Sequence, residues 1–486
     1  MVMKCFEVEF SELAREPLFC LSQQFHKSKK EINNLHNFLN AKVRDYCDIV
    51  SGFAFSSNDY EAEGKTMRRK VKLVRIGDFD NQELNLKDCI YLPEDFENKF
   101  QKFLLQEGDI LIAMTGATIG KSSLVEKLNE NLLLNQRVGI LRAKNKDVSS
   151  RFFSYLVKCN FFRKQIIIAS MGKSQSNISP FDILNIKIPA ISKEIQDQIV
   201  AKIEPIEQKI KDLKNQIKKP QEVINKVFAR EFGFDENLYN EFGKGMTAGT
   251  QIANDKTLRV FDIDFAGLAR SGILRFSTRY HNPPTRKLMD ILDGIEAVKV
   301  KDIVLEAIHR GASPIYSENG LVPVVKTGHL KNGYIEISQE EFVEDKFYKS
   351  SIRSQIRNGD ILIASTGKGS LGKIDLVETD EELVADGHLS IIRVDEKKCN
   401  RLFLVYFFRS VLGYFQIERD FTGATNQIEL YANEIGNFLI PNLPLANQQK
   451  IVDEIKLELD SQEQIKKQIE AERQKIDVII EQSISS

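Results

Sequence analysis

The chain contains a long internal repeat, and this repeat limits its fold more than any other feature of the sequence. Residues 8–26 align without a gap to residues 263–281, with six identical positions. Residues 108–126, GDILIAMTGATIGKSSLVE, match residues 359–378, GDILIASTGKGSLGKIDLVE, with one inserted residue. A period this long makes each copy one structural unit. We therefore predict two copies of one domain rather than a single large domain.

Each copy is predicted to be a mixed, strand-rich domain followed by a long helix. Short alternating apolar segments come first, punctuated by Gly, Asn and Pro, and a charged segment with helical periodicity follows them. The predicted fold class is α+β, with two tandem pseudo-symmetric domains. Weaker matches fill the remaining length: VRIGDFDNQEL from Val74 with VKTGHLKNGYI from Val325, NQRVGILRA from Asn135 with DGHLSIIRV from Asp386, and IPAI from Ile188 with IPNL from Ile440.

The predicted boundaries follow the changes in this pattern. A stretch rich in Gly, Asn and Thr, FGKGMTAGTQIANDK, lies between the copies and has no periodicity, which is typical of a connector. The predicted segments are a first domain over 1–191, a first spacer helix over 192–231, a connector over 232–262, a second domain over 263–443 and a second spacer helix over 444–486.

Both charged segments carry a heptad stripe of aliphatic residues. Pro220 interrupts the first stripe, and Glu458 and Gln462 occupy two seam positions of the second. Stripes of about four heptads indicate that the two helices pair with each other, and the alternative is a helix packed on its own domain. At about 1.5 Å of rise per residue, the first stripe would span roughly 43 Å. The predicted seam residues are Ile199, Ile203, Ile206, Ile210, Leu213, Ile217, Ile451, Ile455, Ile465, Ile469 and Ile476.

The composition is that of a folded protein in a reducing compartment. Hydrophobic residues make up 42% of the chain and charged residues 28%. The formal net charge is −1, so any nucleic-acid surface must be a local concentration of Lys and Arg. The six cysteines lie far apart without a C-x-x-C pair, which predicts neither disulfides nor a zinc site. Because the sequence has no signal peptide and no apolar run approaching ~18 residues, we expect a cytoplasmic protein that makes no membrane contact.

Each candidate catalytic motif lacks a residue or a spacing that its chemistry requires. Residues 116–122 form a glycine loop one residue too short for a nucleotide-binding P-loop, and residues 367–373 precede Ile374 where a hydroxyl is needed. Residues 282–285, Asn-Pro-Pro-Thr, lack the aromatic side chain with which adenine methyltransferases stack a flipped base. The six histidines have no metal-ligand spacing. The sequence therefore predicts a binding protein with no catalytic or metal site.

Three kinds of segment carry side chains suited to DNA. A basic run between residues 60 and 75 could neutralise phosphates, and a solvated strand or loop would look the same. Polar turns at 172–177 and 422–427 occupy equivalent places and carry side chains that read base edges, although plain loops are equally open. The glycine loops add hydroxyl and ammonium groups. The predicted DNA-binding residues are Lys65, Arg68, Arg69, Lys70, Lys72, Thr115, Lys121, Lys173, Ser174, Gln175, Lys368, Lys373, Thr425 and Asn426.

With these segments in place, the chain resembles the specificity subunit of type I restriction-modification systems over essentially its full length. The resemblance implies two target-recognition domains separated by two long helices, which form an antiparallel coiled coil. Each domain would read one half of a bipartite site in double-stranded DNA. The motifs that carry the resemblance are SGFAFSS at 51–57, GDILIAMTGATIGK at 108–121, RGASPIYSENG from Arg310, GDILIASTGKGSLGK at 359–373, and the two I-P to Q-x-x-I-V entries at 188–200 and 440–452.

The resemblance also implies partner subunits. Two methyltransferase subunits would dock on this chain, and restriction subunits with translocase activity would join them for cleavage. Those partners would use S-adenosylmethionine, ATP and magnesium, and this chain would carry no cofactor.

Other interpretations remain open from the sequence. A non-catalytic two-domain scaffold with coiled-coil helices explains the heptads but not the duplicated polar turns. A specificity subunit of another restriction class, in which one enzyme both cuts and methylates, would have the same pattern. An enzyme would require that the isolated chain bind a methyl donor.

Overall fold

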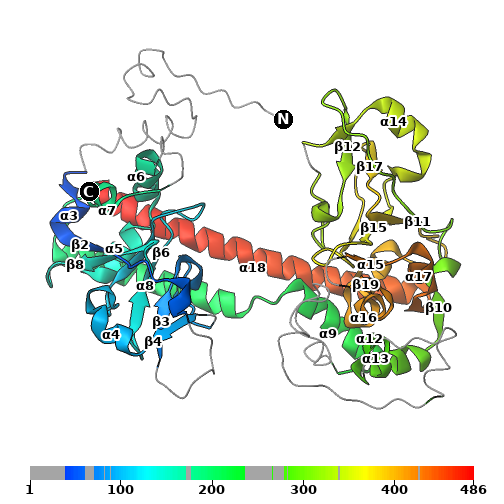
Figure 1. The fold of residues 1–486 in the computed structure, drawn as a ribbon, viewed down its shortest axis with the longest axis horizontal. Helices are drawn as coiled ribbons and strands as arrows, with labels where there is room; N and C mark the ends of the chain where they lie inside the picture. The colour runs from blue at the N-terminus through cyan, green and yellow to red at the C-terminus, as the bar shows by residue number, and fades with distance from the viewer. Residues whose placement is uncertain are drawn as a thin grey trace. The chain divides into compact units, whose positions relative to one another are not determined.

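A computed structural model describes residues 39–60, 70–81, 83–87, 89–170, 177–235, 265, 278–281, 283–337, 340–424 and 427–485. The chain divides into two compact units (Figure 1). Unit 1 comprises Met1–Gln216 and Lys467–Ser486, and unit 2 comprises Ile217–Lys466. The repeat over 8–26 lies outside the described residues, as does most of its second copy.

Unit 1 is built around two small sheets. The first is antiparallel with the strand order β2-β8-β5-β6, and the second has the order β4-β3-β7, in which β3 and β7 run parallel. A short pair, β1 with β9, joins the two ends of the domain. The strands are β1 (Ala41–Lys42), β2 (Cys47–Ser51), β3 (Lys70–Val74), β4 (Ile90–Pro93), β5 (Ile110–Ala113), β6 (Ser122–Leu124), β7 (Leu132–Leu134), β8 (Val138–Ala143) and β9 (Lys187–Ile188).

Short helices complete the domain of unit 1. They are α3 (Val43–Tyr46), α4 (Asp95–Lys99), α5 (Ser150–Leu156), α6 (Asn160–Ser170) and α7 (Pro180–Leu184), with single 3₁₀ turns at Ser57–Asp59, Ile76–Asp78 and Gln101–Phe103. Ser179 caps α7 and Pro180 occupies its first turn, where the missing N–H of proline costs no hydrogen bond.

Unit 2 repeats this topology. Its sheets have the orders β11-β18-β15-β16 and β13-β12-β17-β14, and β10 with β21 joins the ends of the domain. Its strands are β10 (Ala297–Lys299), β11 (His309–Arg310), β12 (Val322–Val325), β13 (Phe342–Val343), β14 (Gln355–Ile356), β15 (Ile361–Ala364), β16 (Ile374–Leu376), β17 (Leu383–Ala385), β18 (Leu389–Ile392), β19 (Thr422–Ala424), β20 (Gln427–Glu429) and β21 (Leu439–Pro441). The predicted α+β class with two tandem pseudo-symmetric domains is confirmed.

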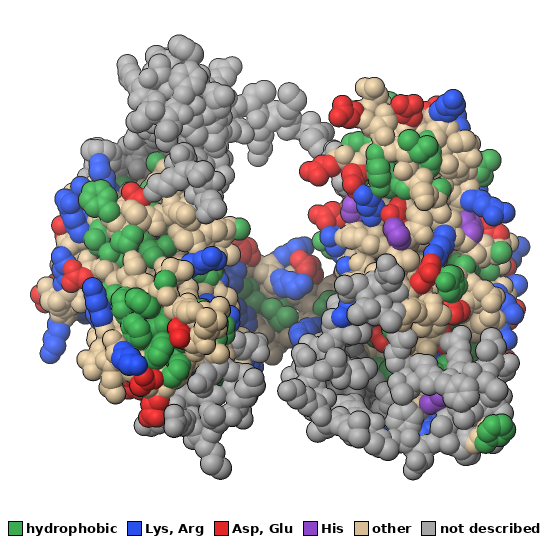
Figure 2. All heavy atoms as spheres, in the orientation of Figure 1, with side chains coloured by type: hydrophobic (Ala, Val, Ile, Leu, Met, Phe, Trp, Pro, Cys, Tyr) green, Lys and Arg blue, Asp and Glu red, His purple; other side chains and the backbone are tan. Residues whose placement is uncertain are grey.

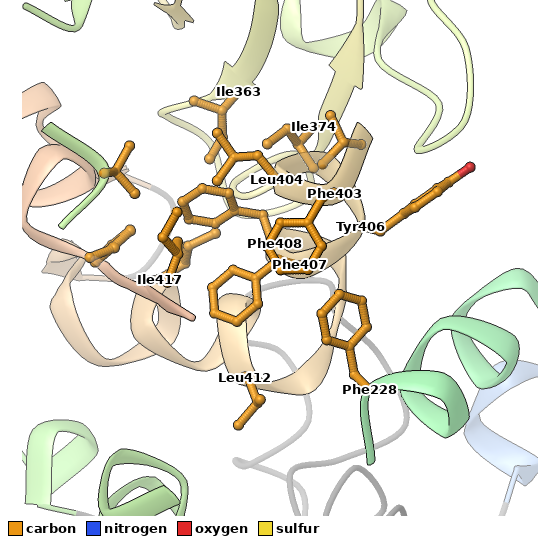
Figure 3. Close-up of a cluster of buried hydrophobic side chains, with 14 of the residues drawn as sticks. Phe228, Ile363, Ile374, Phe403, Leu404, Tyr406, Phe407, Phe408, Leu412 and Ile417 are labelled. Carbon is orange, nitrogen blue, oxygen red and sulfur yellow. The ribbon is translucent and has the colours of Figure 1, made fainter. Parts of the chain in front are cut away.

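The helices of unit 2 follow the same order. They are α12 (Thr278–His281), α13 (Pro283–Asp293), α14 (Asp345–Ser350), α15 (Arg401–Arg409), α16 (Val411–Asp420) and α17 (Ala432–Asn437), with 3₁₀ turns at Val300–Asp302, Thr327–His329 and Ile352–Ser354. Their aromatic side chains fill the larger core, where Phe403, Phe407 and Phe408 of α15 lie close together (Figure 3).

The repeated sequence ILIA forms the central strand of each first sheet. Successive side chains of a strand point to opposite faces. Ile110 and Ile112 accordingly join the helix-covered core of unit 1, while Leu111 and Ala113 join the core on the other face. The residues of β15 divide between two cores in the same way. Burial on both faces explains why this motif is apolar at every position.

An ion pair between an arginine and a buried aspartate recurs beside this strand. Arg142 donates to both carboxylate oxygens of Asp109, at 2.7 Å each. Arg393 binds Asp360 in the same way, at 3.0 and 3.3 Å. In both copies the arginine also donates to a backbone carbonyl, that of Leu104 or that of Gln355. The aspartate in GDILIA is therefore structural.

The first spacer segment is two helices, which corrects the prediction of one helix over 192–231. These helices are α8 (Lys193–Asn215) and α9 (Pro220–Phe232), and the second spacer helix is α18 (Leu445–Ser485). Pro220 lies in the first turn of α9, where the missing N–H of proline costs no hydrogen bond. The estimate of roughly 43 Å for one continuous helix therefore does not apply to this segment.

The helices pair in opposite directions within each unit. In unit 2, the Lys218 amide donates to Gln462 at 2.8 Å, and Arg230, twelve residues later, binds the earlier residue Glu454. In unit 1, Lys209 of α8 binds Glu472 of α18 at 2.6 Å. The polar seam residue Gln462 thus satisfies a backbone group freed by the break between α8 and α9.

The aliphatic stripe packs on the partner helix and on the domain cores together. Ile199 and Ile203 share a core with Ile480 and the unit 1 domain, and Ile451 and Ile455 share one with α9 and the unit 2 domain. Both predicted packing modes therefore occur. Of the predicted seam residues, Ile206, Ile465 and Ile476 are partly buried, Ile217 is exposed, and the buried ones are Ile199, Ile203, Ile210, Leu213, Ile451, Ile455 and Ile469.

Among the described residues, no helix combines the length and the apolar character that a membrane crossing needs.

Candidate nucleic-acid interface

Loops from distant parts of the sequence meet at one edge of the first sheet in unit 1. The Gln136 amide donates to the Phe53 carbonyl at 2.9 Å, and the Met114 amide donates to the Arg137 carbonyl at 3.1 Å. Thr115 pairs with Asn177 in an isolated bridge. We call residues 51–55, 115–121, 135–137 and 177 the loop edge of unit 1. It joins the segments that follow β2 and β5 with the turn that precedes β8.

Unit 2 builds the same loop edge with equivalent hydrogen bonds. The Ser365 amide donates to the His388 carbonyl at 2.9 Å, and Ala312 pairs with Asp386 in a parallel bridge. Thr366 pairs with Glu429, as Thr115 pairs with Asn177. The loop edge of unit 2 comprises residues 310–312, 366–373, 386–388 and 422–431, without 425 and 426. Its two β19 and β20 strands form a hairpin that belongs to this edge.

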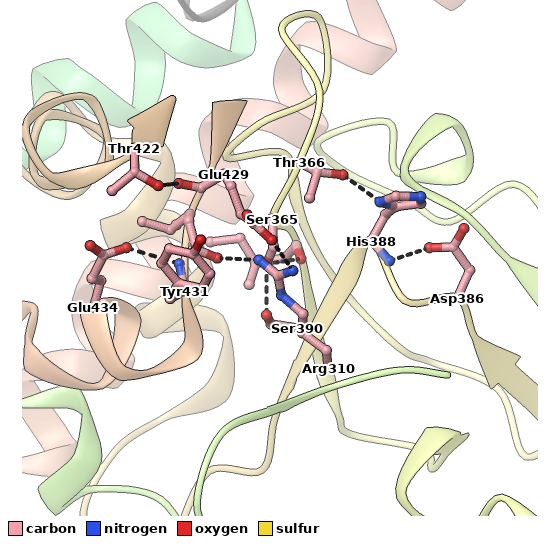
Figure 4. A network of polar contacts seen from close by, with 12 residues as sticks. Arg310, Ser365, Thr366, Asp386, His388, Ser390, Thr422, Glu429, Tyr431 and Glu434 are labelled. Carbon is pink, nitrogen blue, oxygen red and sulfur yellow. Dashed lines mark hydrogen bonds and ion pairs between the residues drawn. The ribbon is translucent and has the colours of Figure 1, made fainter. Parts of the chain in front are cut away.

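Arg310 anchors this hairpin (Figure 4). Its guanidinium binds the Glu429 carboxylate, donates to the Leu430 carbonyl at 3.0 Å and lies 5.5 Å from the centre of the Tyr431 ring. The hydrogen bond from Arg310 lowers the pKa of Glu429. Three contacts from one planar group fix the hairpin against β11.

A second network holds the turn before β18. The Thr366 hydroxyl and the Nδ1 atom of His388 are 2.8 Å apart, and the His388 amide donates to Asp386 at 2.6 Å (Figure 4). Burial raises the pKa of the Asp386 carboxyl. The histidine side chain itself is exposed. The loop edge of unit 2 therefore presents an ordered imidazole to solvent.

Two of the predicted DNA-binding lysines are engaged within unit 1. Lys121 donates to the Ile76 carbonyl, and its ammonium lies 4.8 Å from the centre of the Phe79 ring. Burial lowers its pKa. Lys72 binds Glu130 at 2.6 Å, and its side chain is 18% exposed. These contacts give both lysines structural partners in this state of the protein.

The glycine loops have a turn function. Gly116, Gly120, Gly367 and Gly372 all have φ between 79° and 88°, a backbone region that favours glycine. Each loop leads into a strand, β6 or β16, whereas a P-loop leads into a helix. Thr115, Lys368 and Lys373, the other predicted residues of these loops, are partly buried on the loop edges.

The remaining predicted contacts cannot be placed on the structure. Lys70 belongs to β3, but its side chain is not described. Lys65, Arg68, Arg69, Lys173, Ser174, Gln175, Thr425 and Asn426 lie outside the described residues. Along the chain, residues 171–176 directly precede Asn177, and residues 425–426 lie between β19 and β20. Both segments are therefore adjacent in sequence to a loop edge.

The sequence predictions missed several residues of the loop edges, among them the exposed Arg137 of unit 1. Arg310 and His388 take part in the networks of unit 2, and Phe53 is 38% exposed beside Asn135. The alignment of NQRVGILRA with DGHLSIIRV already paired residues 135–137 with residues 386–388 as equivalent positions. It placed unlike polar residues on a shared backbone frame.

On the face drawn in Figure 2, basic and acidic side chains of the described residues are interspersed. Within the described part of the chain, no group of three or more His, Cys, Asp and Glu side chains could hold a metal ion.

The comparisons agree with the duplicated architecture. A family model described as the type I restriction modification DNA specificity domain matches residues 36–222 and 293–472. The type I restriction enzyme MjaVIII specificity subunit of Methanocaldococcus jannaschii is 29% identical over 208 residues, which are 41% of this chain and 48% of that protein. The type I restriction enzyme EcoAI specificity subunit of Escherichia coli is 26% identical over 194 residues, which are 38% of this chain and 29% of that protein.

The matched parts are limited in length. This chain spans less than half of each of these two curated relatives. A solved chain, described with the complex assembly and conformational transition of the type I R-M system, is 14% identical, with 91% of this chain and 96% of that chain covered and a TM-score of 0.47.

Proposed function

Since this chain belongs to the family of type I restriction modification DNA specificity domains, we propose that it is the DNA-reading specificity subunit of a type I restriction-modification enzyme. Each unit reads one half of a bipartite target in double-stranded DNA. The chain thereby directs the partner subunits to that target.

One observation carries this proposal: the same loop edge is built twice on the same backbone frame, but with different exposed side chains. Phosphate contacts position a protein on DNA, and side chains that reach base edges specify the sequence. Two equal frames with unlike side chains are therefore suited to two unlike half-sites. A scaffold has no need for such a difference between its copies.

The chemistry of the enzyme belongs to the partners in this proposal. This chain carries no catalytic residue and no cofactor, and it acts in the cytoplasm. Two methyltransferase subunits use S-adenosylmethionine, and restriction subunits use ATP and magnesium. In this proposal the partner subunits dock on the paired helices, whose outward positions are charged and exposed.

Long-read sequencing of N6-methyladenine tests the proposal. The chain is expressed together with the methyltransferase subunit encoded beside it, and the methylated motif is determined. We expect one bipartite motif with a nonspecific gap, methylated only when this chain is present. Methylation that does not depend on this chain would refute the proposed function.

A further inference from the structure

Each loop edge contains one three-residue turn that is hydrogen-bonded to several of the segments around it. In unit 1 this turn is 135–137, and in unit 2 it is 386–388. The Asn135 amide donates to the Val74 carbonyl at 3.0 Å, and the Asp386 amide donates to the Val325 carbonyl at 3.0 Å. The carbonyl of the third residue accepts from the amide directly after the strand that precedes the glycine loop, that of Met114 at 3.1 Å in unit 1 and that of Ser365 at 2.9 Å in unit 2. The backbone of the two turns is therefore fixed in the same way.

Neither of the first two positions of the turn offers a side chain that could read DNA in both units. The side chain of the first residue closes the turn, because Asn135 and Asp386 each accept a hydrogen bond from the amide two residues later. The second residue is Gln136 in unit 1 but Gly387 in unit 2, which has no side chain. Only the third position offers an exposed side chain in both units.

The third position differs in chemistry between the units. It is Arg137 in unit 1 and His388 in unit 2, and both side chains are exposed. His388 uses Nδ1 for its contact with Thr366, which leaves the other ring nitrogen for a partner. An arginine at the end of a rigid turn can give both ends of its guanidinium fork to the O6 and N7 atoms of guanine.

We infer that Arg137 and His388 are the equivalent base-reading residues of the two half-sites, and that Arg137 reads a guanine. The inference rests on the proposed function and adds the residues that determine specificity. The rigid turn supports this role, because a base contact requires a side chain that starts from a fixed backbone position.

The test uses the full chain with its methyltransferase partner and the same methylation map. Four variants are compared with the wild type: Arg137→His, Arg137→Lys, His388→Arg and, as a matched control, Arg163→His. Arg163 is an exposed arginine of α6 and is not one of the loop-edge residues. Arg137, His388 and Arg163 are all exposed, and thermal unfolding is measured for each variant to separate a change in the motif from a loss of stability.

We expect Arg137→His and Arg137→Lys to lose discrimination for guanine at one position of one half-site, by about 10- to 100-fold. His388→Arg should change one position in the other half-site only, and Arg163→His should leave the motif intact. An unchanged motif with uniformly weaker methylation in the Arg137 variants would mean a phosphate contact and would overturn the inference. An unchanged motif with full methylation would overturn it as well.

Failure of the proposed function gives a different result. In that case the wild-type chain itself directs no bipartite methylation, whereas failure of the inference leaves the wild-type motif in place and unaltered in the variants.

Discussion

At the scale of residues, equivalent buried positions of the two units differ in whether their side chains can titrate. Asp375 of β16 is buried and accepts hydrogen bonds from the amides of Asn332, at 2.9 Å, and Gly333. Burial raises the pKa of its carboxyl to about 6. Its counterpart in β6 is Ser123, whose buried hydroxyl has no hydrogen-bond partner among the described residues. Unit 2 therefore contains a buried titratable group where unit 1 contains a neutral one.

We expect this carboxyl to make the stability of unit 2 depend on pH. The folded pKa of Asp375, about 6, lies above its ordinary value of 3.8. The folded state therefore holds this proton more tightly, and stability is lost as the pH rises from about 4 to about 6, by roughly 3 kcal/mol. Asp375→Asn should remove this dependence, as measured by denaturant unfolding between pH 4 and 7.

Asp293→Asn, which changes an exposed carboxylate of α13, serves as the control and should unfold like the wild type at every pH. Parallel pH profiles for the wild type and Asp375→Asn would contradict the assignment.

At the scale of elements, a glutamine fixes the start of each spacer helix to its domain. Gln196 is 1% exposed, accepts from the Ser149 amide at 2.8 Å and donates to the Ile191 carbonyl at 2.9 Å. Gln448 makes the equivalent contacts with Asn400 and Leu443, both at 2.8 Å. The glutamine of the repeated Q-x-x-I-V motif thus connects the helix, the loop before it and the domain.

Replacement of this glutamine should loosen the helix start. Gln196→Ala leaves the Ser149 amide and the Ile191 carbonyl without their partner, and we expect a loss of about 1–3 kcal/mol. Amide hydrogen exchange should accelerate in the first turns of α5 and α8. Gln198→Ala, at an exposed position of the same helix, should leave exchange there unchanged, and equal effects of the two substitutions would argue against this role.

Helix length should set the gap between half-sites. Because Lys209 lies opposite Glu472, one heptad inserted after Asp212 of α8 and one after Gln468 of α18 keep the pairing. Seven residues add about 10 Å of helix, or about 3 base pairs of DNA. We expect the methylated motif to keep both half-sites and to lengthen its gap accordingly.

The same heptad inserted into the predicted connector, 232–262, is the control for this experiment and should not change the gap. A constant gap after the paired insertions would show that the length of the helices does not set the distance between the half-sites.

At the scale of the whole molecule, duplication makes the units exchangeable. In each unit the ends of the domain come together in a short antiparallel pair, β1 with β9 and β10 with β21. The chain therefore enters and leaves each domain at the same place. The domain between these points can be replaced without interrupting a spacer helix.

A chain with two copies of the unit 2 domain should read one half-site twice. We expect residues 298–440, grafted in place of 41–188, to give a methylated motif in which both halves carry the sequence specified by unit 2. The methylation map of the chimera provides the measurement. Retention of the wild-type half-site of unit 1 would mean that specificity lies outside the grafted domain.

The sequence by itself determined the repeat, the fold class and the central ILIA strands, because these depend on local periodicity and on burial of both strand faces. It also located the glycine loops and the helical stripes. The position of Pro220 marked the start of α9, although its effect was underestimated, since a proline within an apparently continuous stripe can either kink a helix or start a new one.

Only the tertiary structure decided which loops meet and which charges remain available. Lys121 and Lys72 are residues of a type that often contacts DNA phosphates. Each has a partner from a distant segment instead: Lys121 binds the Ile76 carbonyl and Lys72 binds Glu130. Arg137 and His388 occupy one position on a common frame, which requires hydrogen bonds between residues far apart in sequence. A local pattern does not contain such pairings, because they arise when strands from separate parts of the chain enter the same sheet.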